Sequence, residues 1–112
     1  MSIDRWSDNI AVVELQDDPA FTDDVTALLD EVEKNSSLHV VLNFSAVNYV
    51  NSSNLAKLLK LRKRLVLADR RLVLCCINTD VWGLFLATEL DKVFEFTDDL
   101  GTALASIQVN TT

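Results

Sequence analysis

Residues 38–65, LHVVLNFSAVNYVNSSNLAKLLKLRKRL, constrain the fold more than any other part of this chain. They begin with a nearly continuous apolar run over 38–44, which is typical of a strand covered on both faces. A polar turn follows, and Ser52 and Ser53 then open a predicted helix. A serine at a helix N-terminus lies where backbone N–H groups and the helix dipole tolerate negative charge. The pattern therefore favours a phosphorylation switch in a binding protein over a catalytic pocket.

Strand-like and helix-like segments alternate along the whole chain. Hydrophobic periodicity predicts strands over 1–6, 9–16, 38–44, 71–77 and 92–96, and helices over 19–34, 52–68, 79–88 and 99–108, the first starting at residue 19 or 22. Thr79 or Asp80 is expected to cap the third helix, and Thr97 or Asp98 the fourth. This alternation predicts an α/β fold: one domain over 1–112, with a mostly parallel mixed sheet of four to five strands and about four helices.

The helix over 52–68 carries a leucine-rich stripe. We expect its buried positions to be Leu55, Leu58, Leu59, Leu65 and Val66. Arg62 interrupts this stripe, so its guanidinium must either extend to solvent or find a partner. Partners of parallel sheets usually meet the loops at the carboxyl ends of strands. The loops at 51–53 and 78–80 are both of this kind, and we expect them to be neighbours.

Composition limits the classes of function. The chain is 49% hydrophobic with only two Gly and one Pro, which is enough for a single core. No apolar run approaches the ~20 residues needed to cross a bilayer. The first eight residues are too polar for a secretory signal, so we expect a cytoplasmic protein. A net charge of −7 argues against a general role in nucleic-acid binding.

The charges are unevenly distributed. Ten of the seventeen acidic residues lie in the first 33 residues, and seven of the ten basic residues lie between Lys57 and Arg71. One side of the domain is therefore expected to be acidic and another basic. Two interpretations remain open: the charges are solvated helix faces, or they form a rim that steers one protein partner.

Taken in this order, the segments resemble the STAS domain, the fold shared by bacterial anti-sigma factor antagonists and the cytoplasmic tails of sulfate transporters. The signature of that family is a hydrophobic strand, a short turn, and Asp-Ser-Ser/Thr-Gly at the start of a leucine-rich helix. The matching residues here are Asn51-Ser52-Ser53-Asn54, followed by Leu55. The segment 79–96 and the closing amphipathic helix are also similar, so the resemblance covers nearly the whole chain.

The resemblance implies a regulatory binding module, not an enzyme, that needs no cofactor and no metal. In such antagonists a kinase that is also the anti-sigma factor phosphorylates the first serine of the motif, here Ser52, and this prevents binding; a phosphatase reverses it. The implied partners are thus an anti-sigma factor/serine kinase and a phosphatase, and the apolar content leaves room for a homodimer. The expected partner-binding residues are Asn51, Ser52, Ser53, Asn54, Lys57, Lys60 and Trp82.

Two departures from the family signature support an alternative. Asn51 replaces the Asp and removes the carboxylate beside the serine, and Asn54 replaces the Gly and adds a side chain near the expected path of a nucleotide phosphate. Both favour a non-phosphorylated STAS subunit of a membrane transport complex that binds a transporter ATPase. A simpler interpretation also stays open, in which Ser52 and Ser53 only supply capping hydroxyls.

The remaining reactive or aromatic side chains have structural explanations. Cys75 and Cys76 are adjacent on a predicted strand, so we expect their side chains on opposite faces, as buried reduced thiols without metal or redox spacing. His39 has no acid or nucleophile tied to it by a local motif, which argues against a catalytic triad. Trp82 is expected either in the core or as an exposed anchor for a partner.

Overall fold

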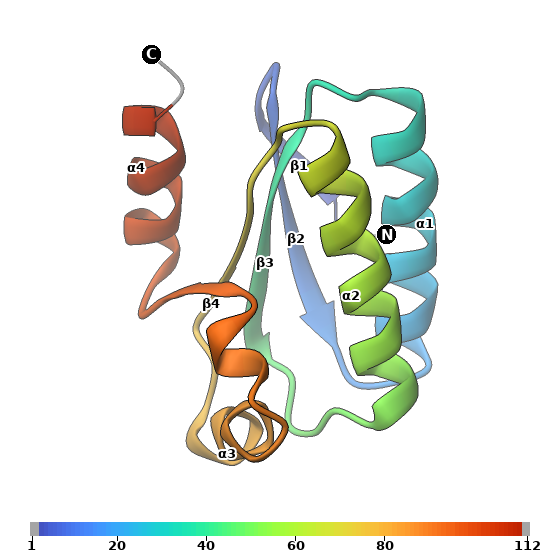
Figure 1. The fold of residues 1–112 in the computed structure, drawn as a ribbon, viewed down its shortest axis with the longest axis vertical. Helices are drawn as coiled ribbons and strands as arrows, with labels where there is room; N and C mark the ends of the chain where they lie inside the picture. Colours follow the sequence, from blue (N-terminus) through green and yellow to red (C-terminus); the bar gives the residue numbers. More distant parts are fainter. Residues whose placement is uncertain (1–2, 111–112) are drawn as a thin grey trace.

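A five-stranded mixed sheet forms the centre of the computed structural model, which describes residues 3–110 (Figure 1). The strands are β1 Ile3–Ser7, β2 Ile10–Gln16, β3 His39–Ala46, β4 Leu72–Cys75 and β5 Glu95–Thr97. Their order in the sheet follows their order in the chain; β1 pairs antiparallel with β2, and every other pair is parallel. The predicted α/β fold is confirmed, although residues 1 and 2 of the first predicted strand lie outside the described residues.

Helices cover both faces of the sheet (Figure 1). They are α1 Ala20–Lys34, α2 Ser52–Leu67, α3 Thr79–Ala87 and α4 Leu100–Asn110, with a short 3₁₀ helix, η1, at Leu90–Lys92. Helices α1 and α2 pack side by side on one face, and α4 covers the other. Helix α3 lies at the end of the molecule where the parallel strands finish. This arrangement places the β3–α2 and β4–α3 loops at the same edge of the sheet.

The central strand β3 is buried on both faces, as its continuous apolar run predicts. Val40, Leu42 and Phe44 belong to the core beneath α1 and α2. Val41 points the other way and packs with Ile107 beneath α4. Because neighbouring strand residues alternate between two separate cores, positions 40–42 and 44 are all buried and apolar. The one polar side chain of β3 before Asn43 is the buried His39 at its start.

The buried stripe of α2 differs in phase from the predicted one. Leu55, Leu58 and Leu65 are buried as expected, but the fourth buried leucine is Leu61. The prediction was wrong for Leu59, which is 38% exposed, and for Val66, which is 56% exposed. The inward face follows 54, 58, 61 and 65, the regular helical spacing, and the two exposed residues lie on its outer border. Arg62 does find a partner, since its Nε donates to the Val93 carbonyl at 3.0 Å.

The ends of several elements also differ from the prediction. Strand β4 stops at Cys75 because Cys76 adopts a left-handed backbone with φ 63°, which ends the extended conformation. The predicted strand over 92–96 divides into η1 and β5. Asn78 rather than Thr79 or Asp80 caps α3, accepting from Val81 N at 2.8 Å.

The cap of the last helix differs in the same way. Asp99 Oδ1 accepts from Thr102 N at 2.7 Å, so neither Thr97 nor Asp98 caps α4. In both helices the capping side chain lies three residues before the N–H group that it accepts from, and its residue immediately precedes the first helical residue.

The acidic α1 and the basic α2 are neighbours on one face of the sheet. Arg64 of α2 pairs with Glu33 of α1 at 3.1 Å. Arg5 of β1 pairs with Glu31 of α1 at 2.7 Å. The acidic and basic segments of the sequence therefore partly neutralise one another instead of forming opposite sides of the domain.

Candidate binding surface at the start of helix α2

Helix α2 begins with a reciprocal capping arrangement made by two asparagines. The Asn51 side chain accepts from Asn54 N at 2.8 Å, and the Asn54 side chain accepts from Asn51 N at 3.0 Å. This is the capping-box geometry, with Asn54 in the place usually taken by Glu or Gln. Ser52 and Ser53 are exposed, and neither hydroxyl makes a hydrogen bond to any group that the structure describes. Capping therefore does not explain the two serines.

Asp18, at the end of the β2–α1 loop, anchors both asparagines. Asn54 Nδ2 donates to Asp18 Oδ2 at 2.9 Å, and Asn51 Nδ2 reaches the same oxygen at 3.4 Å. The other oxygen, Oδ1, accepts from the backbone N and the hydroxyl of Thr22 at 2.8 and 2.7 Å. The Thr22 hydroxyl and the Asn54 amide together lower the pKa of Asp18, which is therefore a carboxylate at neutral pH.

Asp17 holds the middle of the β3–α2 loop. Its carboxylate accepts from the backbone N of Asn48 at 2.8 Å, from Asn48 Nδ2 at 2.9 Å and from Tyr49 N at 3.4 Å. The Asn48 side chain is the largest cause of the lowered pKa of Asp17. Sequence reasoning missed the roles of Asp17 and Asp18. The available signal was their place at the end of β2, because parallel neighbouring strands end at the same edge.

The β3–α2 and β4–α3 loops are neighbours, as predicted from the sequence. Asn78 caps α3 and also donates from Nδ2 to the Val47 carbonyl at 2.9 Å. One side chain thus fixes the β4–α3 loop against the β3–α2 loop, in addition to the two aspartates on the other side. The backbone that leads into Ser52 is held from both flanks.

The structure brings most of the predicted partner-binding residues to one surface. Asn51, Ser52, Ser53 and Lys60 are exposed, and Lys57 is half-buried. Asn54 is only 1% exposed, so the prediction that it contacts a partner is wrong: its amide faces Asp18 and supports the loop from beneath.

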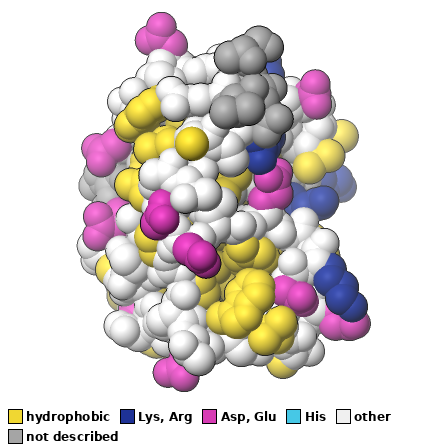
Figure 2. Space-filling model, turned by 90° about the vertical axis from the view of Figure 1, so that its left-hand side faces the viewer, with side chains coloured by type: hydrophobic (Ala, Val, Ile, Leu, Met, Phe, Trp, Pro, Cys, Tyr) yellow, Lys and Arg dark blue, Asp and Glu magenta, His cyan; other side chains and the backbone are white. Residues whose placement is uncertain are grey.

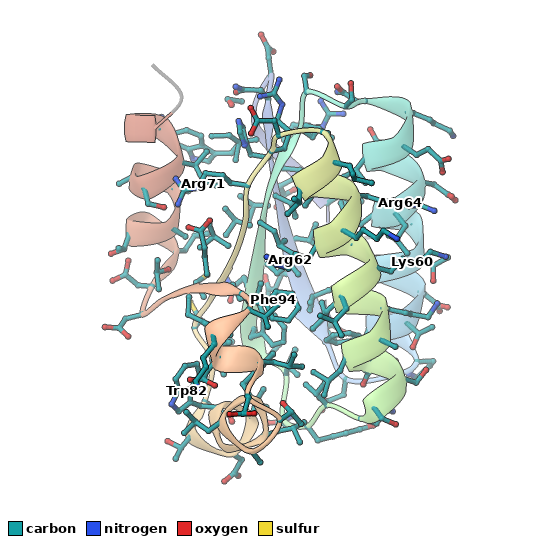
Figure 3. All side chains as sticks on the ribbon, in the orientation of Figure 1. Lys60, Arg62, Arg64, Arg71, Trp82 and Phe94 are labelled. Atoms are coloured by element: carbon teal, nitrogen blue, oxygen red, sulfur yellow. The ribbon has the colours of Figure 1, made fainter. Side chains whose placement is uncertain are left out.

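Trp82 is separate from that surface and half-buried on α3. Its ring meets the Phe96 ring edge to face, with centroids 4.9 Å apart. Figure 3 shows Trp82 beside α3, far from Lys60 on the outer side of α2. The structure therefore does not join Trp82 to Lys60 in one patch.

The cysteines do not lie on opposite faces, contrary to the prediction. The left-handed backbone of Cys76 turns its side chain so that the two Sγ atoms are 3.6 Å apart. Burial, more than the neighbouring Cys76, raises the pKa of Cys75 to about 12, so its thiol stays protonated.

His39 has a structural role. It is 3% exposed, and its Nδ1 accepts from Arg71 N at 3.0 Å. Burial is the main cause of its lowered pKa, followed by Arg70 and Arg71, so the ring is held neutral. Among the described residues, no group of three or more His, Cys, Asp or Glu side chains could hold a metal ion.

Together, the sheet order and the helix layers define an α/β domain that exposes two serines at a capped helix start. The chain belongs to the STAS domain family, whose family model matches residues 7–103. No curated protein matches the chain. Within residues 3–110, no helix combines the length and apolar character needed to cross a membrane.

Solved structures share the fold at low sequence identity. An anti-sigma-factor antagonist (STAS) domain protein from Planctomyces limnophilus has a TM-score of 0.77 and 16% identity, over 88% of this chain and 91% of that one. The RsbS protein of Moorella thermoacetica, in a serine-to-glutamate variant, gives 0.80 and 19%, over 95% and 92%. The anti-sigma factor antagonist SpoIIAA in its unphosphorylated form gives 0.72 and 13%, over 99% and 98%.

Proposed function

We propose that this protein acts as an anti-sigma factor antagonist: it binds an anti-sigma factor/kinase, and phosphorylation of Ser52 prevents that binding. The observation that supports this most is the state of Ser52 itself. Its hydroxyl is exposed at the first residue of α2 and free of hydrogen bonds within the described residues, while Asn51 already caps the helix. A kinase can therefore modify the hydroxyl without breaking a contact that holds the fold.

The electrostatics of the helix start suit a switch. The first turn of α2 holds no acidic residue, so the positive end of the helix dipole has no carboxylate on that turn. A phosphoryl group would add about −1.5 to −2 charges there at pH 7. The isolated domain can hold this charge in water beside the helix N-terminus. A partner packed over Ser52 would have to remove water from the phosphoryl group. Phosphorylation therefore destabilises the complex more than it destabilises the isolated domain.

The outer face of α2 supplies a surface for the partner. Following Ser52 along the helix, the exposed residues are Ser53, Ala56, Leu59, Lys60, Lys63, Val66 and Leu67. Three of them are large apolar side chains, and Leu67 is 77% exposed. Apolar positions interleaved with lysines suit a protein partner with acidic residues around an apolar contact. A partner on this face would cover Ser52 at its N-terminal end.

Two departures from the family signature, Asn51 in place of Asp and Asn54 in place of Gly, are the sequence arguments for a non-phosphorylated protein. The geometry weakens both arguments. Asp18 Oδ2 lies 3.4 Å from Asn51 Nδ2, so a carboxylate supplied by a different loop lies next to the residue that replaces the family Asp. An Asp at 51 would face Asp18 as a like charge, which explains an amide at this position. Asn54 points inward to Asp18 and does not stand over Ser52.

The test is incubation with the anti-sigma kinase of the same organism and ATP, followed by mapping of phosphate by mass spectrometry. We expect stoichiometric modification of Ser52, none in Ser52→Ala, and full modification in the matched control Ser53→Ala. Phosphate only at a distant residue, or none, would contradict the proposal. Failure of phosphorylation together with capture of a transporter ATPase would favour the alternative, a non-phosphorylated subunit of a membrane transport complex.

A further inference from the structure

A second surface feature lies beyond the α2 face, at the carboxyl ends of β4 and β5. It is a hollow of about 280 Å³ lined by Ile77, Thr79, Trp82, Phe96, Thr97 and Asp98. Ile77 precedes α3 and Thr79 is its first residue, whereas Thr97 ends β5 and Asp98 follows it in the loop before α4. Figure 3 shows Trp82 at this end of the molecule. None of the features described for the Ser52 surface uses this hollow.

Aromatic rings line the hollow and are fixed by the core. The Trp82 and Phe96 rings meet edge to face at an interplanar angle of 83°. Phe96 in turn packs against Phe85, with centroids 5.1 Å apart, and Phe85 is completely buried. Trp82 is only half-buried. The hollow thus offers aromatic surface that is held in place without a bound partner.

Acceptor groups line the rim of the hollow. Asp98 is exposed, and its carboxylate makes no hydrogen bond or ion pair with any other described residue. The hydroxyl of Thr97 donates to the Asp99 carbonyl at 2.9 Å, so its oxygen keeps accepting capacity toward the hollow. No lysine or arginine is among the lining residues. Figure 2 shows an apolar patch on the lower part of this face with acidic side chains beside it.

An aromatic surface next to an unpaired carboxylate is complementary to a cation. The face of an aromatic ring attracts an ammonium or guanidinium group, and the carboxylate adds a charge-assisted hydrogen bond. A guanidinium also stacks on aromatic rings and presents several donors. The charge of −7 on the whole chain further favours a positively charged occupant.

The volume of the hollow favours a single side chain over a larger ligand as its occupant. Pockets for drug-sized molecules span roughly 300–1,000 Å³ and enclose most of their ligand. At about 280 Å³ this hollow is at the lower limit of that range. It fits one long side chain that enters from a surface lying above it.

We propose that the hollow receives an arginine side chain of the protein partner, with the guanidinium between Trp82 and Asp98. This rests on the proposed function, because the occupant belongs to the partner that docks over Ser52. The two places are linked: Asn78, beside the hollow, donates to the Val47 carbonyl in the loop that leads into α2. A partner that covers this loop can extend one side chain past Asn78 into the hollow.

The test uses the whole ¹⁵N-labelled protein and a small probe, Nα-acetyl-arginine amide, with Nα-acetyl-citrulline amide as a neutral probe of the same shape. The chain has two tryptophans, so the Trp82 indole N–H signal reports the hollow and that of Trp6 on β1 serves as an internal control. We expect a saturable shift of the Trp82 signal at millimolar arginine probe and binding of the citrulline probe about tenfold weaker.

Two variants sharpen this test. Asp98→Asn should weaken binding of the arginine probe about fivefold or more. Asp8→Asn, at an exposed acid in the β1–β2 turn, should leave it unchanged. Both positions are exposed, so both variants are expected to fold.

The proposal would be overturned if the arginine and citrulline probes bound with equal affinity, or if Asp98→Asn bound the arginine probe as tightly as the unmodified protein. Equal shifts of the Trp6 and Trp82 indole N–H signals would also overturn it. Micromolar affinity for the free probe would also contradict it, since that would indicate a small-molecule pocket. Ser52→Asp should bind the probe as the unmodified protein does. A failure of the probe therefore overturns the arginine site and leaves the proposed function standing. A failure of Ser52 phosphorylation with normal probe binding overturns the proposed function, and with it the assignment of the arginine to that partner, but not the cation-binding hollow.

Discussion

At the scale of single residues, the Asn54 amide joins the start of α2 to the β2–α1 loop. It accepts from Asn51 N and donates to Asp18 Oδ2, both within 3.0 Å, and it is 1% exposed. A glycine, which the STAS signature has at this position, could make neither contact. From the sequence alone Asn54 is a surface neighbour of Ser52, because nothing local indicates that Asp18 approaches from another loop.

We predict that Asn54→Ala lowers the free energy of unfolding by about 1–3 kcal/mol, because it removes a cap partner and leaves Asp18 with one fewer donor. Denaturant unfolding measures this. The matched control is Ser53→Ala, which removes an exposed hydroxyl without hydrogen bonds and should change stability by less than about 0.5 kcal/mol. Equal effects of the two substitutions would contradict the account of the loop.

His39 should make stability depend on pH between 7 and 5. Its pKa is lowered from 6.5 by burial, so the unfolded chain takes up a proton first as the pH falls below about 6.5. His39→Asn keeps an acceptor for Arg71 N without a titrating ring. We expect the unmodified protein to lose stability over this range relative to His39→Asn, measured by unfolding at each pH.

If the free energies of unfolding of the unmodified protein and of His39→Asn change with pH in the same way, the role given to His39 is wrong. The carboxylates of Asp17, Asp18 and Asp99, whose pKa values are lowered from 3.8, do not interfere with this measurement. They stabilise the fold above their unfolded pKa, and this contribution is lost only as the pH falls below about 4.

At the scale of elements, the order and type of the helices and strands follow from hydrophobic periodicity, but the details at their ends do not. The continuous apolar run of β3 predicted its burial on both faces correctly. The phase of α2 was harder, because leucines at 55, 58, 59, 61 and 65 form a band wider than the buried face. Which of them turn inward depends on how α2 packs against α1 and the sheet, and the α2 sequence does not contain that information.

The observed phase predicts different costs for two neighbouring leucines. Leu61→Ala should lower the free energy of unfolding by about 2–5 kcal/mol, because Leu61 is completely buried. Leu59→Ala should lower the free energy of unfolding by clearly less than Leu61→Ala does, since the Leu59 side chain is 38% exposed. Thermal or denaturant unfolding of the pair gives the comparison. A larger loss for Leu59→Ala would mean that α2 packs in the phase first expected from its sequence.

At the scale of the whole molecule, topology brings together what the sequence separates. Asp17 and Asp18 lie more than 30 residues from Asn48 and Asn51, yet their loops meet because parallel strands β2 and β3 end at one edge. The exposed start of α2 could be predicted from the strand–turn–serine pattern. The aspartates beneath it, and the placement of Trp82 over a separate hollow, depend on the tertiary fold.

The most direct test of the central claim, that charge at Ser52 governs docking, is the affinity of the anti-sigma kinase for Ser52→Asp, measured by titration calorimetry. Ser36→Asp, an exposed serine in the loop before β3 at the other end of the sheet, is the matched control. We expect the affinity of Ser52→Asp for the kinase to fall by about 100-fold or more, and the affinity of Ser36→Asp to equal that of the unmodified protein. Unchanged affinity of Ser52→Asp would contradict the account.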